Sequence, residues 1–136
     1  MRFGRVMLSP SVEKRLLQAT ITLACIVPVS AGLIGVFRGA MLLGGGTADM
    51  DSHFRYLSGL LLGIGLGFLS TIPKIEHRTA RIRLLTLIVV IGGVGRLLGL
   101  FLAGEPGPAM LAALGMELVV TPLFCLWQYR VARRFV

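Results

Sequence analysis

Two ionisable side chains lie inside apolar stretches of this 136-residue sequence and are its first candidates for chemistry. Arg96 interrupts the run VVIGGVGRLLGLFL, and Glu117 interrupts the run MLAALGMELVVTPLF. A guanidinium is a permanent cation that can hold a carboxylate through two parallel hydrogen bonds. An unpaired arginine in the middle of a membrane costs roughly 2.5–3.5 kcal/mol on insertion scales, and a carboxylate that faces the arginine changes this free-energy cost. The short turn GEPGP would bring the two residues to a similar depth on antiparallel helices, so we predict a buried salt bridge between them.

The predicted pair allows two interpretations. It could be a structural pin that fixes the register of two helices. It could also be the floor of a polar pocket for an anionic headgroup, a small ligand or a proton, because ionisable residues inside membranes often serve function. Further polar residues near the same ends of the apolar segments would complete a polar cap above the pair. They are Arg38, Asp51, His53 and Arg55.

A metal site is the alternative interpretation of part of this cap. Asp49, Asp51 and His53 alternate, but the ligands are few and all local. Asp51 or Ser52 as the N-cap of the next helix, with Arg55 pairing to Asp51 one turn on, fits the sequence better. No apolar segment carries an interior histidine for haem, and no Ser–His or Cys–His nucleophile can be assembled. We therefore expect no metal, no cofactor and no enzymatic activity.

The elements that must position these residues follow from composition. The chain is 55% hydrophobic with a mean hydropathy of +0.85. Only 15% of its residues are charged, against roughly a quarter in soluble domains. Four apolar runs are long enough to cross about 30 Å of hydrocarbon. They cover approximately residues 16–37, 54–72, 82–103 and 109–127, and they predict a single all-α domain over residues 1–136, a four-helix transmembrane bundle.

Basic residues flank these runs and predict the orientation of the bundle. Eleven of the fourteen lysines and arginines fall in three segments: Arg2, Arg5, Lys14 and Arg15; Lys74, Arg78, Arg81 and Arg83; and Arg130, Arg133 and Arg134. The positive-inside rule then makes both termini and the middle loop cytoplasmic. The net charge of +8 is explained by anionic membrane lipids as partners, and no nucleic-acid partner is expected, because no basic stripe is interleaved with stacking aromatics.

Glycines at helical spacing predict where the helices pack. In membranes, small residues let helix backbones approach closely. One stripe is Gly59, Gly63 and Gly67, in steps of four that begin at Arg55, and another is Gly92 and Gly99 beside Arg96. We expect both stripes to contact another helix, in this chain or in a partner.

Three segments resemble a family of small bacterial membrane proteins known as domain of unknown function 4345. They are DSHFRYLSGLLLGIGLGF, IPKIEHRTARIRLLTLIVVIGGVGRLLGL and ELVVTPLFCLWQ. The resemblance runs from the first apolar segment to Gln128 and leaves out the residues before Ser11. It implies a four-helix, multi-pass protein of the bacterial inner membrane, and it implies no activity, because the family has none assigned.

Two functions remain in view. With little mass outside the membrane, the chain is expected to serve as a scaffold or accessory subunit of a larger membrane complex, or to self-associate. The alternative is a binding or transport protein for a lipid or small anion, using the polar cap on the non-cytoplasmic side.

Overall fold

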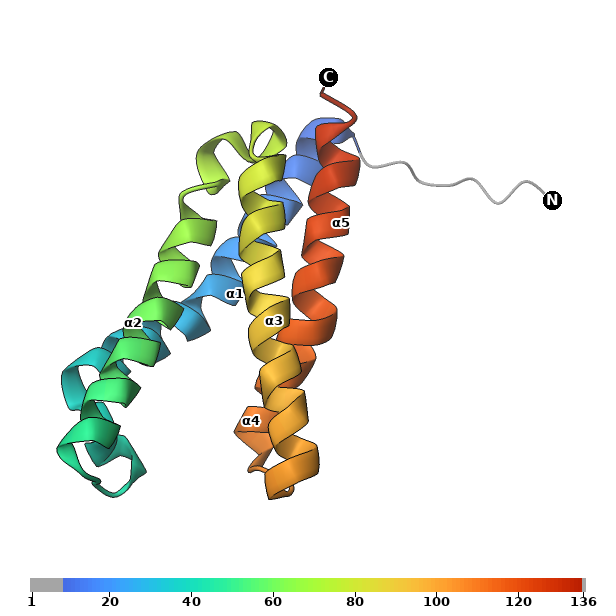
Figure 1. Cartoon of the computed structure of the whole chain (residues 1–136). Coiled ribbons are helices and arrows are strands. Elements are labelled where there is room, and N and C mark those ends of the chain that lie inside the picture. Colours follow the sequence, from blue (N-terminus) through green and yellow to red (C-terminus); the bar gives the residue numbers. More distant parts are fainter. Residues whose placement is uncertain (1–8, 136) are drawn as a thin grey trace. The chain divides into compact units, whose positions relative to one another are not determined.

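The protein is all-α in the computed structural model, which describes residues 9–135 (Figure 1). The elements in chain order are α1 (Pro10–Arg38), the 3₁₀ helix η1 (Gly39–Leu43), α2 (Ala48–Leu69), the 3₁₀ segment η2 (Ile72–His77), α3 (Thr79–Ala103), α4 (Pro108–Gly115), the π-helical turn η3 (Met116–Val120) and α5 (Thr121–Ala132). Of the basic residues that predicted the orientation, Arg2 and Arg5 lie outside the described part of the chain.

Three stretches of the described chain are long and apolar enough to cross a membrane. They are Pro10–Leu43, Thr79–Ala103 and Pro108–Ala132. They indicate a multi-pass membrane protein. The expected span at residues 54–72 is also helical, as part of α2, but it is not among these candidates. The physical reason is that the first two turns of α2 carry Asp49, Asp51, His53 and Arg55, which lower its mean hydropathy.

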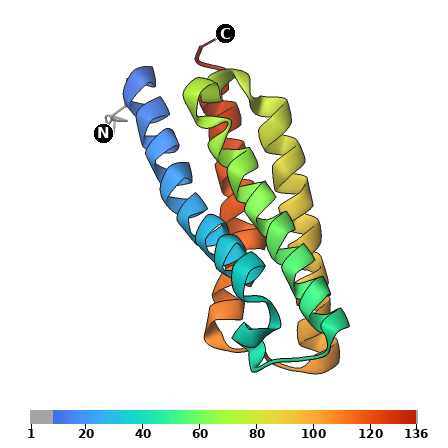
Figure 2. The ribbon, with the colours of Figure 1, turned by 90° about the vertical axis from the view of Figure 1, so that its left-hand side faces the viewer.

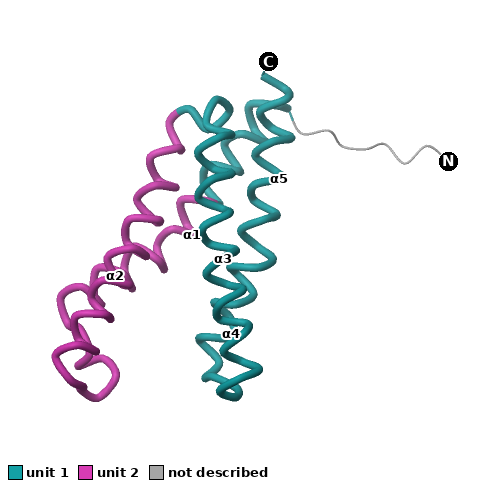
Figure 3. The backbone as a smooth tube through the Cα atoms, in the orientation of Figure 1, with its two compact units in different colours: residues 1–20, 74–136 teal, residues 21–73 magenta. Residues whose placement is uncertain are grey.

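The chain divides into two compact units, shown in different colours in Figure 3. Unit 1 contains residues 1–20 and 74–136, and unit 2 contains residues 21–73. The boundary falls within α1, so the first turns of that helix belong to unit 1 and its remainder to unit 2. The single domain expected from the sequence stays a prediction, and each unit is described by itself.

In unit 1, α3 and the continuous helix formed by α4, η3 and α5 are antiparallel neighbours (Figure 1). The turn between them begins at Gly104, whose φ of 96° favours glycine. Pro108 then starts α4 at the first helical position, where the missing N–H costs no hydrogen bond. At the opposite end of the unit, Leu17, Ile82 and Val131 are fully buried.

In unit 2, the second part of α1 packs closely against α2. A Cβ atom on Gly32 would lie 2.6 Å from the backbone nitrogen of Leu62, so only glycine permits this approach. The connecting turn, seen in Figure 2, passes through Gly44 with a φ of 87°. The expected N-cap at Asp51 or Ser52 is wrong. The helix begins one turn earlier, because the hydroxyl of Thr47 accepts a hydrogen bond from the Met50 N–H at 3.2 Å.

Candidate functional site

Arg96 and Glu117 form the predicted salt bridge. Arg96 Nε donates to Glu117 Oε2 at 2.9 Å, and Nη2 donates to Oε1 at 2.9 Å, which is the bidentate arrangement. Arg96 Nη1 also donates to the sulfur of Met110 at 3.1 Å. The side chains are 34% and 20% exposed, so the pair is half-buried within the chain rather than buried as predicted. Two helices alone cannot enclose it.

A π-helical turn positions the carboxylate. Pro122 lacks an N–H and cannot bond the carbonyl four residues before it, which weakens the regular α-helical pattern at this point. The Thr121 N–H instead bonds the Met116 carbonyl five residues back, and the Thr121 hydroxyl donates to the same oxygen at 2.8 Å. Such single π turns are frequent at functional positions of helices. Here the turn contains Glu117.

Gly93 makes room for this turn on the facing helix. A Cβ atom at Gly93 would lie 2.8 Å from Leu118 Cδ2 and 2.9 Å from Glu117 Cβ. Gly93 lies three residues before Arg96, on the same face of α3. Gly93 was not among the predicted packing residues, because the sequence does not distinguish it from its neighbours Gly92 and Gly95.

The geometry defines what the pair can do. Both carboxylate oxygens accept from one guanidinium, so the two charges neutralise each other. A group closed in this way has no free charge for an anionic ligand. The contacts therefore favour the pin that fixes the register of α3 against α4–α5.

Asp51 and Arg55 form a second pair, in unit 2, as the sequence predicted. Arg55 Nε donates to Asp51 Oδ2 at 2.7 Å. Arg55 Nη1 donates to the carbonyls of Val36 at 2.6 Å and Phe37 at 3.1 Å, which lie in the last turn of α1. Asp51 Oδ1 accepts from the Ala40 N–H at 2.8 Å. The pair therefore ties the start of α2 to the end of α1.

Hydrogen bonding also sets the acidity of Asp51. The Arg55 side chain, and secondly the Ala40 N–H, hold the pKa of this carboxyl below its usual range. These contacts outweigh a small opposing effect of desolvation.

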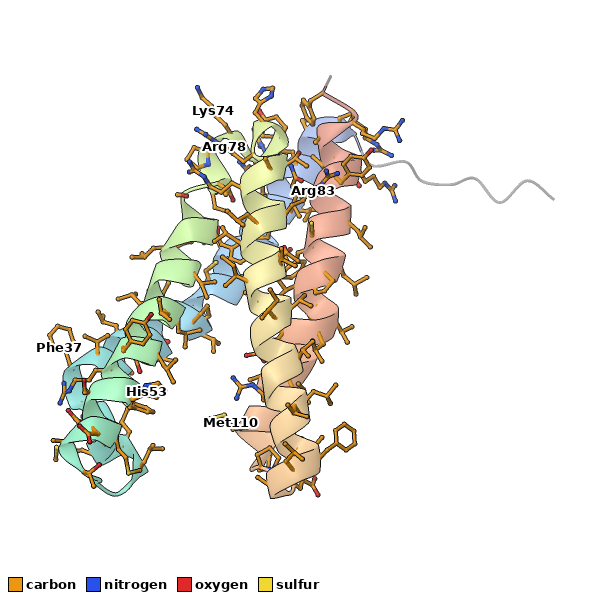
Figure 4. The ribbon with its side chains drawn as sticks, viewed as in Figure 1. Phe37, His53, Lys74, Arg78, Arg83 and Met110 are labelled. Atoms are coloured by element: carbon orange, nitrogen blue, oxygen red, sulfur yellow. The ribbon has the colours of Figure 1, made fainter. Side chains whose placement is uncertain are left out.

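The remaining members of the expected cap are Arg38 and His53 of unit 2. Arg38 and His53 are exposed and make no ion pair with the described residues. His53, labelled in Figure 4, lines an open hollow of about 530 Å³ together with Asp49, Phe54 and other side chains of unit 2. Within residues 9–135, no group of three His, Cys, Asp or Glu side chains could hold a metal ion.

Four of the five glycines in the expected stripes make no close contact with another helix of their own unit. A Cβ at Gly59 would meet only Val36 Cγ2, at 3.9 Å, and one at Gly63 would meet no described atom within 4 Å. The reason is geometric. A step of four residues advances about 400°, so a stripe in such steps drifts about 40° around the helix each time. Arg55 faces α1, whereas Gly63, two steps further on, has turned about 80° away by the same geometry.

The glycine of α2 that makes close contact is Gly65, where a Cβ would lie 2.7 Å from Val29 Cγ2. Gly35 of α1 and Gly39 of η1 make comparable contacts with α2 side chains. On α3, Gly92 and Gly99 have no described atom within 4 Å of a Cβ, so their expected contact is not made within unit 1.

A third charged cluster, which was not predicted from the sequence, is centred on Glu13 of α1 in unit 1. The Glu13 residue is only 5% exposed. Its Oε1 accepts from Trp127 Nε1 at 3.2 Å and lies 3.4 Å from Arg130 Nε, and its Oε2 accepts from Arg134 Nη1 at 2.5 Å. The cluster joins the start of α1 to the end of α5. Arg130 and Arg134, assigned above to lipid headgroups, thus have a partner in the chain.

A neighbouring pair in unit 1 links Lys14 to Glu76 at 2.9 Å. Burial by itself raises the pKa of Glu76, but the hydrogen bond from Lys14 and further favourable contacts outweigh it, and the net shift of the pKa is downward.

Gln128, fully buried, donates to the Ile75 carbonyl at 2.7 Å and to the Thr79 hydroxyl at 3.0 Å.

A signal for these pairs was available in the composition. The sequence has six acidic residues against fourteen basic ones, so every carboxylate is a scarce counter-ion. Four of the six take part in ion pairs: Glu13, Asp51, Glu76 and Glu117.

These features define an all-α, multi-pass membrane protein whose helices are joined by a few isolated ion pairs. Residues 16–128 match the family model described as a domain of unknown function, DUF4345, and the chain belongs to this family. No curated protein and no solved structure matches the chain.

Proposed function

We propose that this DUF4345 protein is a non-enzymatic structural subunit of a membrane assembly. It acts either as a homo-oligomer or as an accessory subunit of a larger complex in the bacterial inner membrane. The observation that carries the proposal is a glycine face on α3 that no other helix of unit 1 covers.

The face consists of Gly92, Gly95 and Gly99, which lie three and four residues apart and therefore on one side of α3. A Cβ on any of them would meet no described atom within 4 Å. At Gly93, one position away, Glu117 and Leu118 of the facing helix already occupy the space that a Cβ would need. Glycine lowers helix stability relative to alanine, and lipid tails do not require it. A face of this kind fits the backbone of a further helix, supplied by another chain.

The half-buried ion pair supports the same proposal. Arg96 lies beside this face, and its side chain is 34% exposed within the chain. Lipid would be a poor neighbour for the exposed part of a guanidinium. A second helix seated on the glycine face would cover it.

We further propose α2 as a fourth span, with both termini and the middle loop in the cytoplasm. The support is the placement of eleven basic residues on these three segments. The apolar run from Leu60 to Leu69 and the closely packed partner α1 supply the rest of a helical hairpin.

The proposal is tested by the mass of the protein purified from its native membranes in mild detergent. We expect native mass spectrometry to detect an oligomer or a complex with a defined membrane protein. Gly95→Leu should reduce that species, because the side chain would hold the partner helix away. Ala112→Leu, at an exposed small residue of α4, is the control and should not reduce it. A wild-type protein that is monomeric with no protein partner would contradict the proposal.

A second candidate function is the binding of a lipid or small anion on the far side of the membrane. The open hollow of unit 2 favours it, because its lining includes Leu43, Met50 and Leu57 next to His53. Apolar walls with a polar edge suit an acyl chain near its headgroup. A stoichiometric small molecule on a monomeric purified protein would favour this candidate over the first.

A further inference from the structure

The basic residues at one end of unit 1 divide into those with carboxylate partners and those without. Lys14 pairs with Glu76, and Arg130 and Arg134 pair with Glu13. Arg83 of α3 and Arg133 after α5 make no ion pair with a described residue. Their charges therefore remain available to a partner outside the chain.

These two guanidinium groups gather on one aromatic ring. The Cζ atom of Arg83 lies over the ring of Tyr129, 5.0 Å from its centroid, and the Cζ atom of Arg133 lies 5.8 Å from it. Cation–π attraction orients both groups without neutralising either. Two like charges held by one ring are most stable when an anion lies between or beside them. Tyr129 is 41% exposed, so an anion can reach the site.

The position along the helices matches the depth of lipid headgroups. Arg83 lies four residues into α3 and Tyr129 three residues before the end of α5, each about 5–6 Å from the helix end at 1.5 Å per residue. Figure 4 shows Lys74, Arg78 and Arg83 at the same end of this unit. A headgroup phosphate next to a spanning helix occupies this level.

We propose that Arg83, Tyr129 and Arg133 form a binding site for the phosphodiester headgroup of an anionic phospholipid. Phosphate oxygens accept the parallel N–H donors of a guanidinium, and the Tyr129 hydroxyl can donate a further hydrogen bond. This site is separate from the glycine face of α3 that carries the proposed assembly role, and each can fail without the other. It also differs from a diffuse basic surface, because one ring fixes two particular guanidinium groups.

The test is native mass spectrometry of the full-length protein with added phosphatidylglycerol or phosphatidylcholine. We expect tighter binding of phosphatidylglycerol to the wild type. The double variant Arg83→Gln, Arg133→Gln should weaken this binding at least about tenfold more than the control Lys74→Gln, Arg78→Gln, because it loses oriented hydrogen bonds as well as charge. The control removes the same charge from the same end of the protein but leaves Tyr129 and its partners intact.

Three further arms separate the remaining explanations. Tyr129→Leu should lower the preference for the anionic lipid, whereas Tyr129→Phe should keep most of it, because the ring orients the arginines. The double variant Arg83→Lys, Arg133→Lys preserves the charge and replaces the glutamine variant if that variant does not fold. It should also lower the preference for the anionic lipid. Inorganic phosphate should fail to displace the lipid, and displacement would identify a free phosphate ion as the ligand instead. Equal losses in the double variant and the control, or no preference for phosphatidylglycerol, would overturn the proposal.

Discussion

Gly93 of α3 lies directly against Glu117, so that a Cβ atom at Gly93 would be 2.9 Å from the Cβ of Glu117. The same approach allows Arg96, on the same face of α3, to hold both oxygens of that carboxylate. A helix contact and an ion pair thus depend on one missing side chain.

Gly93→Ala should lower the stability of the protein by about 1–3 kcal/mol, because the new methyl group overfills this contact. Gly115→Ala is the matched control. A Cβ at Gly115 meets no described atom within 4 Å, so the change should be neutral or slightly stabilising. Thermal unfolding in detergent, followed by circular dichroism, measures both. Equal stability of the two variants would show that α3 and α4–α5 do not pack this closely.

Arg96→Leu should be destabilising, because it leaves Glu117 without its partner in a low-dielectric environment. We expect a cost near the lower end of roughly 3–5 kcal/mol, since the pair is only half-buried. Glu117→Gln should cost less, because the amide oxygen still accepts a hydrogen bond from the guanidinium.

The double variant Arg96→Leu, Glu117→Leu should cost less than the two single leucine variants added together, because no charge remains unpaired. The double-mutant cycle is measured by thermal unfolding in detergent. Additive costs would show that the two side chains do not interact in the folded protein. Retention of the assembly by the double variant would support the structural pin.

Glu13→Ala should destabilise the protein by on the order of 3 kcal/mol, because the buried carboxylate accepts a hydrogen bond from Trp127 and pairs with Arg130 and Arg134. Glu105→Ala removes an exposed carboxylate with no ion pair among the described residues, and its cost should be small. The change in tryptophan fluorescence gives a second readout, since Trp127 is the only tryptophan and loses its hydrogen bond. A Glu13 variant as stable as the Glu105 variant would contradict the cluster.

The Asp51–Arg55 pair should make stability depend on pH in the acid range. The folded-state pKa of Asp51 is lowered, so the folded protein binds fewer protons here than the unfolded chain. The stabilisation is complete above the ordinary carboxyl pKa of about 3.9 and is lost as the pH falls through the lowered folded-state value. The thermal midpoint of Asp51→Asn should therefore fall less steeply with acid than that of the wild type. An acid slope of Asp51→Asn equal to that of the wild type would show that this pair does not stabilise the folded protein.

The orientation is tested with fusions to a reporter that is active only in the cytoplasm. Fusion after Val136, a residue outside the described part of the chain, should give an active reporter. Fusion at Thr47, between α1 and α2, should give an inactive one, because the charge distribution assigns this turn to the far side. The reverse pattern would refute the assigned orientation.

The sequence by itself determined the helical class, three candidate membrane segments and two of the ion pairs. Long apolar runs permit few other structures in a membrane, because every backbone polar group must be paired within the segment. Arg96 and Glu117 could be matched because a short turn forces their helices to be neighbours. Asp51 and Arg55 could be matched because they lie four residues apart on one helix.

Only the tertiary structure decided which glycines pack and which charges meet over long distances in the sequence. The sequence does not distinguish Gly92 from Gly93. The rotation of about 100° per residue turns Gly93 toward α4–α5 and Gly92 away from it. Glu13 and Arg134 are separated by 121 positions. No local spacing relates such residues, so their contact follows only from the packing of the first turns of α1 against the end of α5.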